Sequence, residues 1–308
     1  MPTITTPNTG IELAYETAGD PANETILLIM GLGVQLTHWP EEFVAALVER
    51  GFHVVRFDNR DIGLSEKMGD PKPPSIMWQV LRARIGWKAK VPYTLADMAD
   101  DAAGLLEALG IAKAHVAGAS MGGMIGQLMA INHRDKLLSL TSVMSTTGNP
   151  KLPQADKAAM EALISRPASL EEEVLVEHGI KILNAIGSPG YPTTPERARE
   201  RTLVGIRRSI YPMGLPRQLA AIIDDGDRRA RLARVTTPTL VLHGEDDPLV
   251  KLAGGKETAA AIPGARLVTI PGWGHDLPLA LVDQLADEVA GHARSHAAKE
   301  PDALEAAE

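Results

Sequence analysis

The stretch that most constrains how this chain can fold is Gly-Ala-Ser-Met-Gly at residues 118–122. The apolar run Ala114–Ala117 precedes it and the apolar segment Met124–Ile131 follows, which predicts a strand, a sharp turn and a helix. Ser120 stands at the tip, where a strained backbone pushes the hydroxyl out of the fold, and the flanking glycines leave room where strand and helix nearly touch. The pattern is typical of a nucleophile elbow. The alternative is a glycine-rich turn whose serine caps the helix.

A serine hydroxyl is a poor nucleophile at neutral pH, and it needs a general base that is itself oriented by a carboxylate. Two loops late in the chain offer these groups: His-Gly-Glu-Asp-Asp-Pro at 243–248 and Pro-Gly-Trp-Gly-His-Asp at 271–276. Each follows an expected buried strand. Because the carboxyl ends of parallel strands meet at one edge of a sheet, we expect Ser120, one carboxylate and His275 to lie together. The N–H of Met121, at the start of the helix, is a natural donor to an oxyanion.

Composition excludes several classes of protein. The 308-residue chain has a formal net charge of -8, which argues against a nucleic-acid partner, and it has no cysteine, which excludes disulfides and thiolate metal sites. No spacing of His, Asp and Glu suggests a metal site, and Gly31-Leu32-Gly33 lacks the remaining residues of a dinucleotide or phosphate-binding loop, so we expect no cofactor.

The N-terminus lacks the features of a signal peptide, and no apolar run is long enough for a membrane span, so a cytoplasmic location is expected. The oligomeric state stays open.

Expected strands alternate with expected helices on both sides of a long gap. The strands are expected at 3–4 and 11–17 (a hairpin), 25–30, 53–58, 114–117, 137–144, 239–243 and 266–270. The helices are expected at 40–50, 75–90, 94–109, 124–131, 170–186, 195–210, 252–262 and 277–293, with Thr94 as the cap of its helix.

This alternation predicts one α/β domain with a mostly parallel sheet, formed by residues 1–145 and 232–297. Residues 146–231 are rich in charge, proline and helical patterning and interrupt the strands. An insertion at that point lies over the carboxyl edge of the sheet, where ligands bind, so it is interpreted as a helical lid. Residues 298–308 carry few large apolar side chains and are expected to form a flexible tail.

The order serine, acid, histidine, together with the elbow and the late insertion, resembles the α/β-hydrolase superfamily from about residue 11 to 293. Five motifs stand in the expected order: Gly31-Leu32-Gly33, Asp-Asn-Arg-Asp-Ile-Gly-Leu-Ser at 58–65, the elbow, Gly-Glu-Asp-Asp at 244–247, and Gly274-His275. The resemblance implies an α/β-hydrolase fold with an inserted helical lid.

The resemblance also assigns roles to single residues. Ser120 matches the nucleophile, Asp247 the acid and His275 the general base, while the N–H groups of Met121 and Leu32 match the oxyanion hole. The neighbours Glu245 and Asp246 remain alternatives for the acid. Two further positions are compared with the family in the same way: Arg60 matches an arginine that holds its loop in place, and Met30 stands where many members carry a histidine.

Within the superfamily, the stretches MGLG, WPEEFVAAL, FDNRDIGLS and RQLAAI resemble a bacterial branch of carboxylesterases that includes methylesterases acting on polyketides. The resemblance implies a serine hydrolase that cleaves a small apolar carboxylic ester through an acyl-enzyme intermediate. Two enzyme alternatives share the triad: a carbon–carbon bond hydrolase of ring-cleavage products and a cofactor-free perhydrolase of the haloperoxidase type. A ligand receptor on a hydrolase scaffold is the non-enzymatic alternative.

Overall fold

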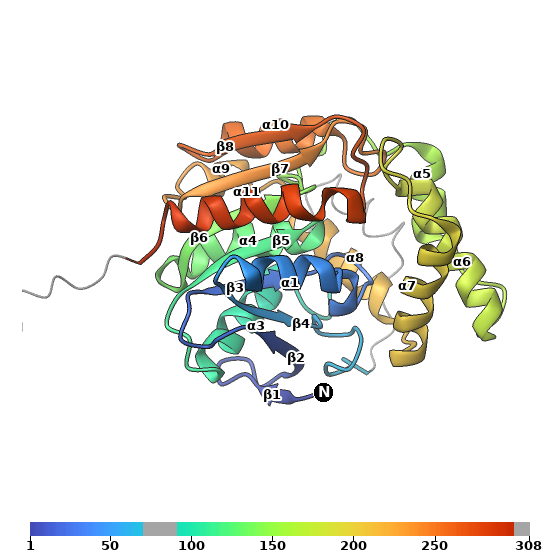
Figure 1. Cartoon of the computed structure of the whole chain (residues 1–308), viewed down its shortest axis with the longest axis horizontal. Helices are drawn as coiled ribbons and strands as arrows, with labels where there is room; N and C mark the ends of the chain where they lie inside the picture. Colours follow the sequence, from blue (N-terminus) through green and yellow to red (C-terminus); the bar gives the residue numbers. More distant parts are fainter. Residues whose placement is uncertain (70–90, 299–308) are drawn as a thin grey trace, which may run out of the picture.

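One eight-stranded sheet lies at the centre of the computed structural model, which describes residues 1–69 and 91–298 (Figure 1). Its strand order is β1-β2-β4-β3-β5-β6-β7-β8, with β1 and β2 antiparallel to their neighbours and the others parallel. The strands are β1 (Thr3–Thr5), β2 (Glu12–Ala18), β3 (Thr25–Ile29), β4 (His53–Phe57), β5 (Ala114–Ala119), β6 (Leu137–Val143), β7 (Thr239–Gly244) and β8 (Arg266–Ile270). The expected mostly parallel sheet is therefore confirmed.

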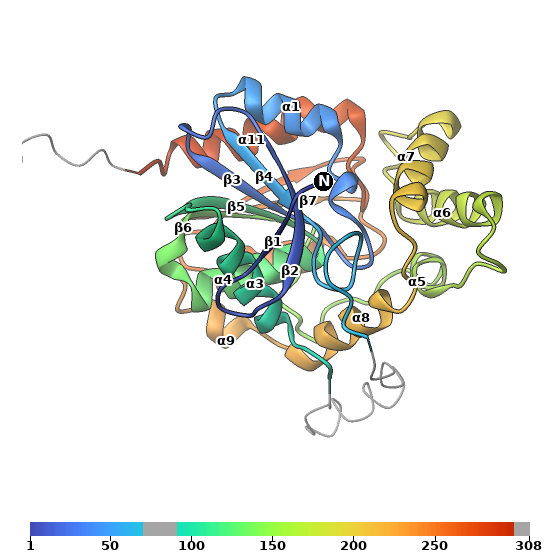
Figure 2. The same cartoon turned by 90° about the horizontal axis from the view of Figure 1, so that it is seen from below.

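Helices cover both faces of this sheet, which makes three layers (Figure 2). On one face lie α1 (Glu41–Glu49) and α11 (Val282–Arg294), and on the other α3 (Leu95–Ala108), α4 (Met121–Asn132) and α9 (Arg229–Leu232). Helix α10 (Leu252–Ala261) packs beside β7 and α9. The central strands are buried on both faces, which explains why β3 is a continuous apolar run rather than an alternating one.

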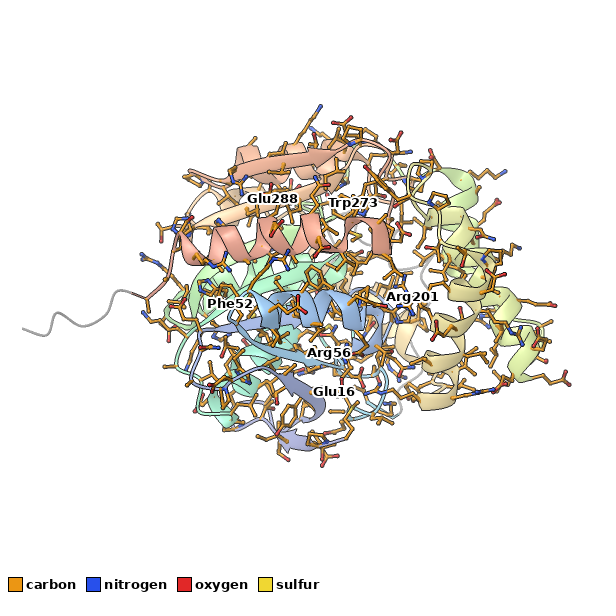
Figure 3. All side chains as sticks on the ribbon, in the orientation of Figure 1. Glu16, Phe52, Arg56, Arg201, Trp273 and Glu288 are labelled. Atoms are coloured by element: carbon orange, nitrogen blue, oxygen red, sulfur yellow. The ribbon has the colours of Figure 1, made fainter. Side chains whose placement is uncertain are left out.

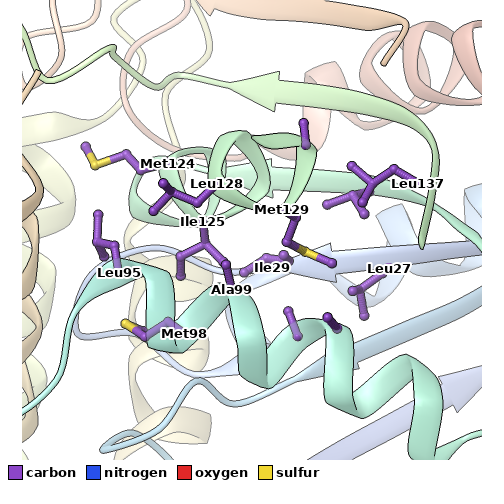
Figure 4. Close-up of a cluster of buried hydrophobic side chains, with 14 of the residues drawn as sticks. Leu27, Ile29, Leu95, Met98, Ala99, Met124, Ile125, Leu128, Met129 and Leu137 are labelled. Carbon is purple, nitrogen blue, oxygen red and sulfur yellow. The ribbon is translucent and has the colours of Figure 1, made fainter. Parts of the chain in front are cut away.

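The core between α3, α4 and the sheet fixes the helix that follows Ser120. Figure 4 shows Met98 and Ala99 of α3 facing Ile125 and Leu128 of α4, with Ile29 of β3 beside them, and all five side chains are buried. Helix α3 starts with a capping box, in which the Thr94 side chain accepts from the N–H of Asp97 and the Asp97 carboxylate accepts from the N–H of Thr94.

Five helices separate β6 from β7: the short α9 described above, and before it α5 (Lys157–Ile164), α6 (Glu172–Ile186), α7 (Pro195–Arg208) and α8 (Gly214–Asp225). Helices α5, α6 and α7 stand at one end of the three layers rather than within them (Figures 1 and 2). Thr194 caps α7 by accepting from the N–H of Arg197, and Pro195 occupies the first turn, so local sequence explains where this helix begins.

Two expectations about helices have other outcomes. The closing helix does not begin at Leu277, because Pro278 is extended and a 3-10 turn at Leu279–Leu281 comes before α11. The helix expected at 75–90 and residues 299–308 of the expected tail lie outside the described residues. Within the part of the chain that is described, no helix combines the length and apolar character that crossing a bilayer requires.

Candidate active site

Ser120 occupies the turn between β5 and α4 with a positive φ of 57°. The turn is tight: a Cβ on Gly118 would overlap the carbonyl of Gly122, and one on Gly122 would overlap the carbonyl of Ile29 in β3. Only glycine therefore fits at these two positions. The Ser120 side chain makes no capping hydrogen bond to α4, so the alternative in which this serine only caps the helix is wrong.

The Ser120 hydroxyl instead lies beside an imidazole. His275 Nε2 is 3.0 Å from Ser120 Oγ, and its Nδ1 is 2.7 Å from Asp247 Oδ2. His275 lies in the loop that follows β8. Its N–H donates to the carbonyl of Ile186, the last residue of α6, at 2.8 Å, and this contact holds the histidine in place. The structure thus brings together three side chains that are separated by up to 155 residues in the sequence.

Asp247 is the carboxylate that reaches the histidine. Its Oδ1 accepts from the N–H groups of Leu249 and Val250, each at 2.8 Å, and the side chain is buried. Burial alone would raise its pKa, but the charge and hydrogen bond of His275 outweigh that effect, and the net pKa of the Asp247 carboxyl is lowered. It is therefore ionised at neutral pH.

The two neighbouring acids of the same loop point elsewhere. Asp246 accepts from the N–H of Gly272, and Glu245 accepts from the Thr269 hydroxyl, each at 2.8 Å, and both are exposed. A second imidazole, His243, lies 3.7 Å from Asp247 Oδ2, but its Nε2 donates to the carbonyl of Val250. Burial lowers the pKa of His243, which keeps it neutral.

The loop Gly31-Leu32-Gly33 lies against the turn at Ser120. An added Cβ on Gly31 would be 3.2 Å from the Ser120 Cβ. Within residues 1–69 and 91–298, the N–H groups of Leu32 and Met121 have no hydrogen-bond partner, so both remain available for a ligand oxygen. Met30 places no imidazole at this point and lines the adjacent cavity.

Side chains far along the chain hold this loop in place. Asn59 donates to the carbonyl of Met30 at 2.9 Å, and the N–H of Gly33 donates to Gln218 of α8 at 2.9 Å. Arg60 forms an ion pair with Asp101 of α3 at 2.6 Å, as a residue that anchors its own loop would.

The sequence does not predict two ion pairs whose carboxylates are fully buried. Arg208 of α7 pairs with Asp58 at 2.6 Å, and Arg217 of α8 pairs with Asp61 at 2.7 Å. Both join the inserted helices to the loop after β4. No local pattern marks either pair, because each joins residues about 150 positions apart.

A cavity of about 440 Å³ opens onto Ser120 and His275. It lies between the sheet edge and the inserted helices, and its walls are mainly apolar. The apolar lining includes Met30, Leu32, Val34, Met124, Met144, Met160, Leu163, Leu175, Ile182, Leu183, Ile186, Ile206, Ile210, Ile222, Leu249, Val250 and Leu277. Among residues 1–69 and 91–298 there is no cluster of three or more His, Asp or Glu that would hold a metal ion.

Comparison with known proteins agrees with this architecture. Residues 24–279 match the family model of the alpha/beta hydrolase fold. Rhodomycin D methylesterase DnrP of Streptomyces peucetius is 30% identical, over 96% of this chain and 99% of its own. Among solved structures, an enol-lactonase from Burkholderia xenovorans LB400 is similar with a TM-score of 0.67 and 27% identity, covering 95% of this chain and 100% of that one. A thermophilic esterase from Thermogutta terrifontis is similar with a TM-score of 0.65 and 26% identity, covering 95% and 96%.

The predicted resemblance is therefore confirmed both in sequence and in fold. The strand order, the glycine-bounded turn at Ser120 and the match over residues 24–279 all agree. The chain belongs to the α/β-hydrolase fold family, as an enzyme of the esterase type.

Proposed function

We propose that the chain hydrolyses carboxylic esters with Ser120 as nucleophile, His275 as general base and Asp247 as the acid that orients it. The observation that carries this proposal is the continuous hydrogen-bond chain from Asp247 through His275 to Ser120, which ends in the apolar cavity. The ionised Asp247 fixes the proton of His275 on Nδ1, so Nε2 is free to accept the serine proton.

In the acylation step, Ser120 Oγ attacks the ester carbonyl carbon and its proton moves to His275 Nε2. The carbonyl oxygen becomes an oxyanion, which the N–H groups of Leu32 and Met121 bind; each such donor contributes about 3 kcal/mol. Collapse of the tetrahedral intermediate breaks the bond to the alcohol oxygen, which takes the proton from His275. Water, deprotonated by the same imidazole, then attacks the acyl-serine, and the acid leaves as Ser120 regains its proton.

The walls of the cavity suggest which esters fit. Most of the side chains around Ser120 are aliphatic or methionine, so the bulk of the substrate is expected to be apolar. Helices α5 to α8 contribute one wall, and in this proposal residues 146–231 act as the lid that excludes water from the acyl-enzyme. The relative that acts as a rhodomycin D methylesterase supports an ester with a small alcohol part.

The test is hydrolysis of 4-nitrophenyl butyrate by Ser120→Ala. The expected result is a fall in kcat of about 10⁴-fold or more. Ser295→Ala, an exposed serine at the end of α11, is the matched control and should keep wild-type activity. A fluorophosphonate should label the wild-type protein on the peptide that contains Ser120. Activity of Ser120→Ala above one tenth of wild type would contradict the proposal.

A further inference from the structure

Arg201 differs from the other arginines of α7. The helix carries five arginines, and four of them pair with a carboxylate: Arg197 with Glu42, Arg199 with Glu173, Arg207 with Glu172 and Arg208 with Asp58. Within the described part of the chain, no carboxylate oxygen lies within 4.0 Å of the Arg201 guanidinium. Among residues 1–69 and 91–298, its hydrogen bonds are two long contacts to neutral carbonyls, from Nη1 to Leu277 at 3.4 Å and from Nη2 to His38 at 3.3 Å.

This unpaired guanidinium lines the cavity that opens onto Ser120. Figure 3 shows Arg201 at the boundary between the core layers and the inserted helices. Burial lowers its pKa, and the more distant Asp276 partly opposes that effect, but a guanidinium stays protonated at neutral pH. A charge in a mainly apolar cavity is costly when nothing compensates it, so Arg201 is a feature that packing alone does not explain.

The charged groups around Arg201 indicate where an anion would bind. Asp276 also lines the cavity, and its Oδ1 accepts from the Ser188 hydroxyl, so a ligand carboxylate is disfavoured on that side. His38 also lines the cavity, and burial and the charge of Arg201 lower the pKa of its imidazole to about 3. This imidazole is neutral, and its Nδ1 is buried without a hydrogen-bond partner among the described residues. His38 therefore carries no charge that would repel or bind an anion, and Arg201 is the cation that lines this cavity among the described residues.

We propose that Arg201 binds a carboxylate on the substrate, so that the preferred substrates are esters with a second, free carboxylate group, such as half-esters of dicarboxylic acids. The planar guanidinium fits a carboxylate through two parallel hydrogen bonds, and the low dielectric of the cavity strengthens them. The inference rests on the proposed function, because it adds a recognition element to the same cavity. It makes Arg201 a substrate-binding residue and not part of the proton transfer.

The test compares monomethyl adipate with dimethyl adipate, which have the same chain and differ by one charge. Half-esters of succinate to suberate identify the best length. The wild-type enzyme should prefer the half-ester, and Arg201→Met should raise its KM by about 10- to 100-fold, as expected for hydrogen bonds to a charged group. For the dimethyl ester, which has no free carboxylate, Arg201→Met should raise KM much less, and the melting temperature of the variant shows that it is folded. Arg201→Lys should recover part of the preference, and Arg199→Met, which removes a surface arginine of the same helix, should change neither substrate.

Three outcomes would overturn the inference: equal kcat/KM for the two esters in the wild type, an equal loss for both in Arg201→Met, or a loss confined to kcat. Binding provides a separate measurement. Calorimetry of monomethyl adipate with Ser120→Ala, with and without Arg201→Met, reports on the carboxylate site even if no ester is hydrolysed. Absence of turnover with both esters would contradict the proposed function, whereas equal affinity in the two variants would contradict the role of Arg201.

Discussion

Replacing Asp247 by asparagine tests the geometry of the proposed triad with one atom changed. In the structure, Oδ1 accepts from two backbone N–H groups, those of Leu249 and Val250, and Oδ2 faces His275 Nδ1. An amide at this position will turn its oxygen toward the two N–H donors, because its NH₂ group cannot accept from them. The NH₂ group then faces His275 Nδ1, which must become the acceptor. The proton of the neutral imidazole moves to Nε2, and Nε2 can no longer receive the proton of Ser120.

The loss should therefore affect catalysis and leave binding almost unchanged. Such a tautomer change costs about 10⁴-fold in kcat, which corresponds to about 5 to 6 kcal/mol of transition-state stabilisation. The assay is steady-state hydrolysis of 4-nitrophenyl butyrate, with the melting temperature measured in parallel to show that the buried site is still folded. KM should stay within a few-fold of the wild-type value.

Asp246→Asn is the matched control, because it makes the same change one residue earlier on an exposed side chain that contacts Gly272 and not His275. Its kcat should stay within about twofold of wild type, since exposed substitutions away from a site have small effects. The proposed role of Asp247 is refuted if Asp247→Asn keeps more than one tenth of the wild-type kcat, or if Asp246→Asn is the more damaging of the two.

Two further predictions concern stability. Gly122→Ala should lower the free energy of unfolding, measured in urea, by about 4 kcal/mol or more, because the added Cβ would overlap the Ile29 carbonyl. Gly291→Ala, in α11 with open space around it, should raise the free energy of unfolding by about 0.5 to 1 kcal/mol. A change of the same sign in both variants would contradict this explanation. Burial lowers the pKa of His292 from 6.5 to about 4, so between these pH values the unfolded state binds more protons than the folded state, and the free energy of unfolding should fall as the pH falls. His292→Gln should remove up to about 3 kcal/mol of that fall between pH 7 and pH 4, and an unchanged pH dependence would exclude the role of His292.

Much of the site follows from local sequence. The turn at Ser120 is determined by neighbouring residues, since Gly118 and Gly122 are needed wherever a strand and a helix approach so closely. The positions of Asp247 and His275 follow from a simple rule, because each comes just after a strand of one parallel sheet. The sequence alone does not decide which of three successive acids contacts the histidine. The family resemblance assigns this position to Asp247, and the structure shows that Asp247 makes the contact.

The long-range ion pairs do not follow from sequence. Asp58 and Arg208 lie 150 positions apart, and the chain holds 31 basic and 39 acidic side chains, so charge alone allows far too many pairings. Burial decides among them, and burial depends on how the inserted helices pack on the core. The lack of a carboxylate partner for Arg201 is equally hidden, because its four paired neighbours on α7 look the same in the sequence.

Contacts that the sequence does not predict link the inserted helices to the Gly31–Gly33 loop, which carries the proposed oxyanion donor Leu32. Asp58 uses both of its oxygens: Oδ1 accepts from the N–H of Leu36 at 2.8 Å, just after the Gly31–Gly33 loop, and Oδ2 pairs with Arg208 of α7. Gln218 of α8 joins the same two loops. Its Oε1 accepts from the N–H of Gly33, and its Nε2 donates to the carbonyl of Arg60 at 3.0 Å. A displacement of α8 therefore removes a direct hydrogen bond to Gly33, next to Leu32, and a displacement of α7 removes the ion pair with the Asp58 carboxylate that holds Leu36. Hydrogen bonds and an ion pair thus join the helices that form one wall of the cavity to the segment that carries the proposed oxyanion donor Leu32, so we expect a substrate bound against α7 to affect the geometry of the chemical step.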